Sequence, residues 1–182
     1  MESAAILSGF GGQGLLFAGQ VLAQAGLEAR REVTWLPSYG PEMRGGTASC
    51  TVIVSDRPIG SPIVDAADVV IALNPPSLAR FEAFLRPGGL LVVNASLIET
   101  EARRDDIEVV RVPCSAIARQ SGDDRLVSIV ALGGALARRP IVSRRAARRA
   151  LRIVASKAGP DAVARNLAAL DAGYARGAAS PV

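Results

Sequence analysis

Histidine is absent from the 182-residue sequence, and cysteine is scarce. Histidine is the most common general base near neutral pH and the most common metal ligand, so its absence removes the most frequent catalytic and metal sites. The two cysteines, Cys50 and Cys114, stand far apart, whereas an iron–sulfur cluster usually takes four thiolates. We therefore expect two buried reduced thiols. We expect no catalytic residue, metal ion or tightly bound cofactor in this chain.

Long apolar runs are also lacking. A membrane-spanning helix needs about 18 or more consecutive apolar residues, and no run approaches that length. The N-terminal residues 1–5 contain no basic segment ahead of an apolar stretch, which a signal peptide requires. We expect a cytoplasmic protein with no membrane partner.

Lysine occurs once, at Lys157, so arginine supplies nearly all of the positive charge behind the net charge of +4. The arginines concentrate in residues 138–152. A nucleic-acid site needs a basic face with aromatic or groove-reading residues, and aromatic residues make up only 4% of the chain. We expect no nucleic-acid partner. The favoured interpretation is a solvated helix face, and docking on an acidic partner or an anionic ligand is the alternative.

The hydrophobic content of 49% suits one domain, which we place at residues 1–177 with a frayed tail at 178–182. Apolar runs and turn residues predict strands at 4–8, 33–36, 48–55, 68–73, 90–94 and 108–112. Helical spacing predicts helices at 13–28, 77–85, 115–120, 126–137, 143–156 and 161–176. We expect Pro37 to end the second strand, Ser143 to cap a helix, and Pro160 and Gly177 to bound the last one. This alternation predicts a three-layer α/β/α sandwich with a largely parallel sheet and a helical C-terminal third.

A glycine-rich turn follows the first predicted strand and has the pattern GxGxxG: Gly9, Gly11, Gly12, Gln13 and Gly14 are its candidate binding residues. Glycines let an anion approach the backbone, and the N-terminus of the next helix offers free N–H groups to a phosphate. A turn needed only for packing is the alternative. A dinucleotide site also requires an acidic residue at the end of the second strand, and the residues there are Leu36, Pro37 and Ser38.

A second segment rich in glycine and polar residues, at 38–46, follows the second predicted strand. We expect it to lie beside the glycine turn, because both segments follow the carboxyl ends of what we take to be neighbouring strands. Glu42 and Arg44 are its ionised side chains, and they are predicted to pair with each other or to contact an anionic ligand or a partner. Its candidate residues are Ser38, Tyr39, Gly40, Glu42, Met43, Arg44, Gly45 and Gly46.

Three sequence motifs together resemble those of a known protein family. They are Gly-Phe-Gly-Gly-Gln-Gly at 9–14, Pro-Ser-Tyr-Gly-Pro-Glu-Met-Arg-Gly-Gly-Thr at 37–47 and Ala-Leu-Asn-Pro-Pro at 72–76. In this order, and with the stretch at 54–62, the sequence resembles the gamma subunit or gamma domain of 2-oxoacid:ferredoxin oxidoreductases over residues 3–142. The form of the second motif is closer to the oxoglutarate and branched-chain members than to the indolepyruvate members. One departure is Ser128, where the family often has Asn.

The resemblance implies a subunit of an enzyme that converts a 2-oxoacid and coenzyme A (CoA) to acyl-CoA and CO2 and reduces ferredoxin. Thiamine diphosphate, Mg and iron–sulfur clusters would belong to partner subunits, because this chain has neither a cysteine quartet nor a thiamine motif. The implied partners are alpha and beta subunits and a ferredoxin-like subunit, and the isolated chain would be inactive and able to self-associate. CoA would be a co-substrate, with Gly11, Gly12, Gln13 and Gly14 facing its phosphates and the 38–46 loop closing over it.

Three alternatives stay open on the sequence alone. A stand-alone NAD(P)-binding protein fits the glycine turn but lacks the acidic residue. A ligand-free interaction module fits the absence of catalytic residues. An indolepyruvate-type beta subunit is the alternative within the same family.

Overall fold

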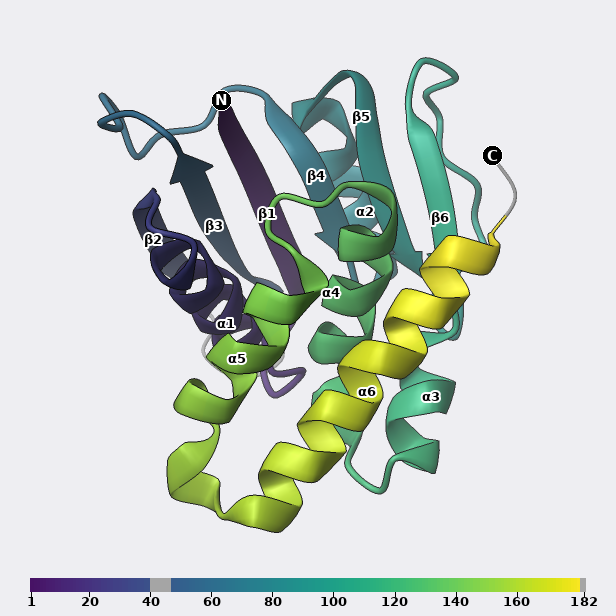
Figure 1. The fold of residues 1–182 in the computed structure, drawn as a ribbon. Coiled ribbons are helices and arrows are strands. Elements are labelled where there is room, and N and C mark those ends of the chain that lie inside the picture. The colour runs from purple at the N-terminus through teal and green to yellow at the C-terminus, as the bar shows by residue number, and fades with distance from the viewer. Residues whose placement is uncertain (40–46, 181–182) are drawn as a thin grey trace.

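A computed structural model describes residues 1–39 and 47–180, which form a six-stranded sheet covered by helices (Figure 1). The strands are β1 (Glu2–Phe10), β2 (Glu32–Tyr39), β3 (Thr47–Ser55), β4 (Ala67–Ala72), β5 (Leu85–Asn94) and β6 (Glu108–Val112). The α-helices are α1 (Leu15–Glu28), α2 (Pro75–Phe81), α3 (Cys114–Gln120), α4 (Val127–Arg138), α5 (Arg144–Val154) and α6 (Pro160–Ala179). Short 3-10 turns are η1 (Glu82–Phe84), η2 (Asp124–Leu126) and η3 (Ser156–Ala158).

The strand order is β2-β3-β1-β4-β5-β6. The pairs β1–β4, β4–β5 and β5–β6 are parallel, and β3 is antiparallel to both β1 and β2. Five of the six strands thus run in one direction, which confirms the largely parallel sheet. The expectation that β1 and β2 are neighbours is wrong, because β3 lies between them. Their carboxyl ends still reach the same edge of the sheet.

Pro37 does not end the second strand, which continues to Tyr39. β2 is an edge strand with only β3 beside it, so one side of its backbone makes no ladder hydrogen bonds. Proline is tolerated at such an edge because its missing N–H removes no bond that the sheet needs. Likewise, β5 begins at Leu85 and includes the predicted turn at Pro87.

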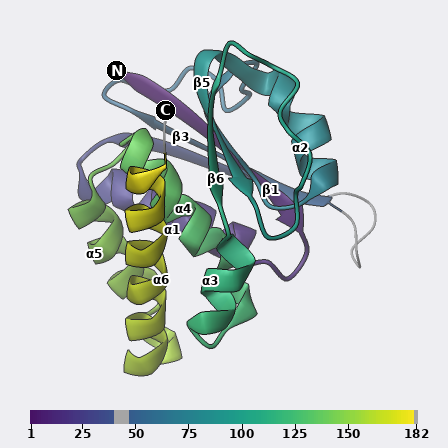
Figure 2. The ribbon, with the colours of Figure 1, turned by 90° about the vertical axis from the view of Figure 1, so that its right-hand side faces the viewer.

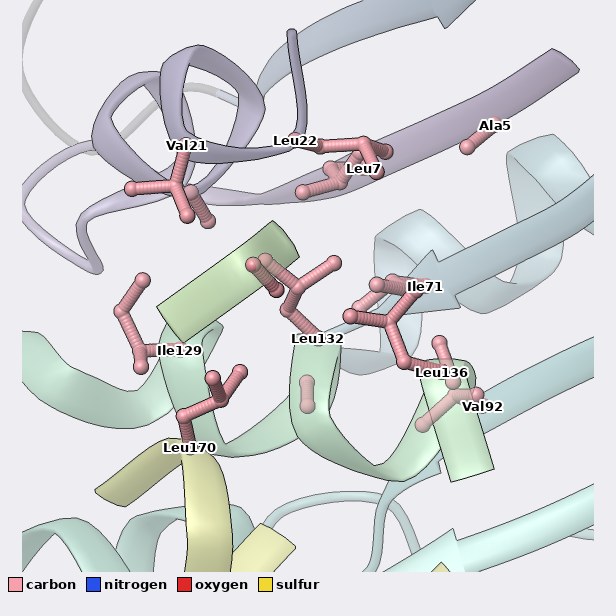
Figure 3. Close-up of a cluster of buried hydrophobic side chains, with 14 of the residues drawn as sticks. Ala5, Leu7, Val21, Leu22, Ile71, Val92, Ile129, Leu132, Leu136 and Leu170 are labelled. Carbon is pink, nitrogen blue, oxygen red and sulfur yellow. The ribbon is translucent and has the colours of Figure 1, made fainter. Parts of the chain in front are cut away.

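The helices form two unequal layers on the sheet. Figure 2 shows α2 alone on one side and α1, α4, α5 and α6 together on the other. The larger core lies under the second group, where Leu7 and Leu22 face Leu132 and Ile129 (Figure 3). A smaller core, with Ile6, Val70 and Phe81, lies under α2. Every side chain of β4 is buried, as expected of a central parallel strand covered on both faces.

α4 lies between the sheet and α6, and glycines let the two helices approach until their backbones touch. A Cβ on Gly173 would lie 2.7 Å from the carbonyl carbon of Val130 and closer still to its oxygen. A Cβ on Gly177 would lie 2.7 Å from Gly134 Cα, and Gly133 meets the backbone of α6 in the same way. α6 continues to Ala179, so Gly177 lies inside the helix and does not end it, and the contact with α4 accounts for its lack of a side chain.

Two predicted helix starts are confirmed. The Ser143 hydroxyl accepts a hydrogen bond from Ala146 N at 3.1 Å and caps α5, and Pro160 occupies the first turn of α6. Among the described residues, no helix has the length and the apolar character that a membrane crossing requires.

Candidate functional site

The glycine turn joins the end of β1 to the start of α1 and is held by Gln13. Its side-chain Oε1 accepts a hydrogen bond from Phe10 N at 2.7 Å, and its backbone N–H donates to Phe10 O at 3.3 Å. Gly12 and Gly14 have φ values of 92° and 75°, which side chains rarely adopt. The turn is thus closed by one side chain and two left-handed glycines.

The four glycines of the turn fall into two groups, according to what surrounds each one. Gly9 and Gly14 are packing positions: a Cβ on Gly9 would lie 3.0 Å from Leu73 Cβ, and one on Gly14 would lie 2.9 Å from Ser128 Oγ. Gly11 and Gly12 are exposed, and a Cβ on either would meet no described atom within 4 Å. The packing interpretation therefore accounts for two glycines and leaves the exposed pair facing open space.

α1 begins with Gly14 as its N-cap, and no described side chain accepts from its first N–H groups. Uncapped N–H groups at a helix N-terminus carry a partial positive charge and suit a phosphate. Exposed glycines at 11 and 12 leave room for such a group beside them. This end of α1 therefore has the physical properties of an anion site.

Polar side chains line the same sheet edge beyond the neighbouring strands. Ser8 donates from its hydroxyl to Ser77 Oγ at 2.9 Å, and Asn74 Oδ1 accepts from Ser77 N at 2.9 Å. Asn94 Nδ2 donates to Leu73 O at 3.2 Å and to Ser115 Oγ at 2.9 Å. These residues, of which only Ser115 is partly exposed, tie β1, β4, β5 and the starts of α2 and α3 into one network, which fixes the geometry of the edge.

Two buried polar atoms at this edge have no hydrogen-bond partner among the described residues. They are Asn74 Nδ2 and Ser128 Oγ, and both residues are fully buried. Ser128 lies in the first turn of α4 and its hydroxyl faces Gly14, so it is not the N-cap of that helix. Sequence reasoning noticed the unexpected Ser128 but did not place it beside the glycine turn. The sequence predicts that Asn74 and the two prolines after it end a strand and start a helix, and Asn74 is the N-cap of α2.

A pocket of about 340 Å³ opens beside Gly14, and sequence reasoning did not find it. Its walls come from η2 and η3 and from the adjoining ends of α1, α5 and α6, and Asn166 and Phe17 line it. Phe17 and Asn166 lie about 150 positions apart, and the packing of α1, α4, α5 and α6 on one another brings them together. The sequence contains one weak indication of this site: Lys157, the single lysine of the chain, lines the pocket.

The structure describes only the two ends of the second predicted segment. Ser38 is exposed near the end of β2 and pairs with Ser49 in β3. The backbone of Tyr39 completes β2 opposite Ala48, and Phe10 pairs with Thr47, so both ends of the segment reach the edge that carries the glycine turn. The remaining candidates lie outside the described residues: Gly40, Glu42, Met43, Arg44, Gly45 and Gly46.

Both thiols are buried and reduced, as expected. Burial raises the pKa of Cys50 to about 12, although a hydrogen bond from Trp35 acts in the opposite direction. Burial also raises the pKa of Cys114. Neither thiol is therefore a nucleophile near neutral pH. No group of three or more potential metal ligands occurs in the described parts of the chain.

Asp123 lines the pocket and is paired with Arg125. Its carboxylate accepts hydrogen bonds from Arg125 Nε at 3.0 Å and from Arg125 N at 2.9 Å. The side-chain bond with Arg125 is the main cause that lowers the pKa of Asp123, and the charge of Arg165 contributes. Arg125 and Arg165 thus both lie close to one carboxylate at the start of α4.

Comparison with known proteins gives consistent matches. A family model described as pyruvate ferredoxin/flavodoxin oxidoreductase matches residues 4–176, beyond the range 3–142 expected from the motifs. The 2-oxoglutarate synthase subunit KorC of Methanocaldococcus jannaschii is 32% identical over 171 residues, which cover 92% of this chain and 90% of that protein. The ketoisovalerate oxidoreductase subunit VorA of Methanothermobacter marburgensis is 40% identical over 127 residues, or 70% of this chain. The match spans about a quarter of that relative, 26% of its length.

Two solved structures have the same fold. A keto/oxoacid ferredoxin oxidoreductase gamma subunit from Geobacter sulfurreducens superposes with a TM-score of 0.85 at 29% identity, over 97% of both chains. The 2-oxoglutarate:ferredoxin oxidoreductase of Magnetococcus marinus, solved with 2-oxoglutarate, CoA and succinyl-CoA bound, superposes with a TM-score of 0.89 at 25% identity. That match covers 99% of this chain and 32% of the other.

Proposed function

The chain belongs to the pyruvate ferredoxin/flavodoxin oxidoreductase family, and we propose that it is the gamma-type subunit of a 2-oxoacid:ferredoxin oxidoreductase. The role of a separate subunit is supported by relatives of the same length, the KorC protein and the Geobacter gamma subunit. The enzyme would oxidatively decarboxylate a 2-oxoacid in the presence of CoA and pass two electrons to ferredoxin.

The remaining parts of such an enzyme must come from other chains. Two buried cysteines that lie far apart cannot bind an iron–sulfur cluster, and the sequence has no thiamine diphosphate motif. Partner alpha, beta and ferredoxin-like subunits would supply thiamine diphosphate, Mg and the clusters. An oxoglutarate or branched-chain substrate agrees with the names of the relatives, 2-oxoglutarate synthase and ketoisovalerate oxidoreductase.

Within this enzyme, we assign CoA binding to the glycine turn. The observation that carries the assignment is the exposed pair Gly11 and Gly12 beside the uncapped N-terminus of α1. A diphosphate there would accept hydrogen bonds from free backbone N–H groups, and no Cβ would obstruct it. Ser128 Oγ, which is fully buried and has no partner in the described chain, lies next to Gly14. In this proposal the loop that contains Arg44 closes over the bound CoA.

The sheet order argues against a dinucleotide dehydrogenase. In that fold, the acidic residue that binds the ribose stands at the end of the strand beside the first one. Here β3 occupies that place and runs antiparallel to β1, and β2 ends without an acidic residue.

A charge test at Gly11 separates binding from folding. Gly11 lacks a positive φ and meets no described atom, so Gly11→Asn and Gly11→Asp are expected to fold equally well. The two side chains have the same shape and differ in charge. In the assembled enzyme, purified anaerobically with its partners, Gly11→Asp is expected to raise the KM for CoA at least tenfold above that of Gly11→Asn. The KM for the 2-oxoacid is expected to stay unchanged in both.

Equal CoA dependence in the two variants would refute CoA binding at this turn. Purification itself tests the subunit assignment, because the chain should recover thiamine-binding and cluster-bearing partners. Recovery of the chain alone, free of thiamine diphosphate and iron, would leave the ligand-free interaction module as the better account.

A further inference from the structure

The solvent side of α5 carries five arginines, and the helix contains no acidic residue. α5 packs on α1, α4 and α6, and Figure 1 shows it in the helical layer beside α1. Small and apolar residues form its buried side: Ala146, Ala147, Ala150 and Leu151. The arginines recur at spacings of three and four residues, which places them together on one face of a helix. We call this surface the arginine face; its members are Arg144, Arg145, Arg148, Arg149 and Arg152.

The arginine face contains more cations than the carboxylates that pair with them. Asp171 of α6 lies 2.8 Å from Arg144 and also pairs with Arg148. Glu28 of α1 lies 3.6 Å from Arg149. Five guanidinium groups thus share two carboxylates, and they line an open hollow of about 660 Å³. This hollow is strongly positive.

The two remaining arginines, Arg145 and Arg152, are exposed and have no ion pair with any described residue. The Nη1 group of Arg152 donates to the backbone carbonyl of Arg148 at 3.3 Å. Like charges one turn apart on a helix repel each other, and a solvated helix face usually alternates the two signs. α5 has no such alternation, so carboxylates from outside the chain would relieve the repulsion. This favours an acidic partner over a merely solvated face.

Exposed apolar side chains accompany the arginines. Ile153 is 48% exposed and follows Arg145 and Arg149 at the same spacing of four residues. Leu27 is 55% exposed and stands next to Glu28, the partner of Arg149. Protein interfaces combine arginines with apolar side chains in this way. A free inorganic anion would leave the apolar residues uncovered, so the surface is better suited to a protein.

The arginine face is poorly suited to a nucleic acid. Stacking on a base needs an accessible aromatic ring, and the guanidinium of Arg144 covers the ring of Tyr174 at 4.7 Å from its centre. The face is also short, since Arg144 and Arg152 are about 12 Å apart along the helix axis. That length spans only about three or four phosphates of one strand.

We propose that the arginine face docks an acidic surface of another subunit of the oxidoreductase. A guanidinium group can bind a carboxylate through two parallel N–H groups, which makes arginine the preferred cation for such a contact. Arg148 and Arg152 lie one helical turn, about 6 Å, apart. Carboxylates four residues apart on a partner helix have the same spacing. This proposal rests on the proposed function, because it takes the partner from the same enzyme.

Charge reversal at the two arginines without an ion pair tests the proposal. Arg145→Glu with Arg152→Glu keeps the pairs of Asp171 and Glu28 and places each new glutamate four residues from an arginine. The isolated variant should therefore match or exceed the wild-type Tm. Its Kd for the thiamine-binding and cluster-bearing subunits, titrated at several NaCl concentrations, should rise at least tenfold at low salt. The wild-type Kd should depend on salt, and that dependence should weaken in the variant.

Arg80→Glu with Arg103→Glu provides the matched control. Both arginines are exposed, neither has an ion pair with a described residue, and they lie beside α2 on the other side of the sheet. This variant has the same change in net charge and should assemble like the wild type. Arg145→Lys with Arg152→Lys keeps the charge and should retain most of the affinity.

The outcomes separate this proposal from the proposed function. Assembly that is equally strong in the α5 variant and the control would overturn the docking surface and leave the subunit assignment intact. An equal loss in both would also overturn it, because net charge would then be the cause. Partner subunits that bind no form of the chain would refute the proposed function itself. Binding of a duplex oligonucleotide that depends on Arg145 and Arg152, without an effect on assembly, would assign the face to nucleic acid and overturn the proposal.

Discussion

Replacement of Gly173 by alanine tests the backbone contact between α4 and α6. The added Cβ would lie 2.7 Å from the carbonyl carbon of Val130, whereas ordinary contacts begin near 3.4 Å. The helices must therefore separate by at least about 0.7 Å, the difference between these two distances. Because the opposing atoms are main chain, no side-chain rotation can relieve the clash.

Two effects of the substitution oppose each other. Alanine is the better helix former by about 1 kcal/mol, which alone would stabilise the protein. Overpacking of a core costs about 1–3 kcal/mol, and a rigid backbone contact belongs at the upper end. We expect a net loss of about 2 kcal/mol, or a Tm lower by about 4–8 °C for a chain of this size.

Urea and thermal unfolding, followed by circular dichroism, measure this loss. Ala175→Gly provides the matched change, because Ala175 is exposed in the same helix and loses only helix propensity. Helix propensity alone predicts that Gly173→Ala stabilises the protein and that Ala175→Gly destabilises it. The packing argument predicts that both substitutions destabilise it. An equal or higher midpoint for Gly173→Ala would refute the close contact.

Two further predictions concern buried polar and ionisable groups. The raised pKa of Cys50 means that its stabilising contribution is complete below its ordinary pKa near 9 and is lost as the pH rises towards about 12. The free energy of unfolding should fall by about 1.4 kcal/mol per pH unit in that range, and Cys50→Ala should flatten the slope in alkaline urea titrations. Ser128→Ala should stabilise the chain by about 1 kcal/mol, because it removes a buried hydroxyl without a partner in the described structure. If Ser128 also contacts CoA, the same variant raises the KM for CoA, and an unchanged KM would exclude that contact.

Local patterns predicted most of the elements. The apolar run of β4 and the β-branched run of β3 indicated their strands, and Ser143 marked the start of α5 by its capping hydroxyl. The class of the sheet followed from the alternation of these elements.

Errors arose where distant contacts override local preference. The position of β3 between β1 and β2 depends on pairing across the sheet, which the sequence pattern does not contain. Pro37 lies within a strand that tolerates it at the edge of the sheet, and Gly177 lies within a helix where the contact with Gly134 leaves no room for a side chain. For the site, the motif identified the glycine turn but did not separate Gly9, which packs, from Gly11, which is exposed.

The contact between α4 and α6 also determines how the adjoining pocket can respond to ligands. Glycine on glycine has no rotamers, so this junction cannot adjust by repacking as a contact between leucines does. The junction therefore resists widening, and the wall that α6 gives the pocket, with Ala162, Arg165 and Asn166, keeps a nearly constant position relative to Leu126 at the start of α4. The pocket should discriminate by shape, excluding larger molecules instead of expanding around them.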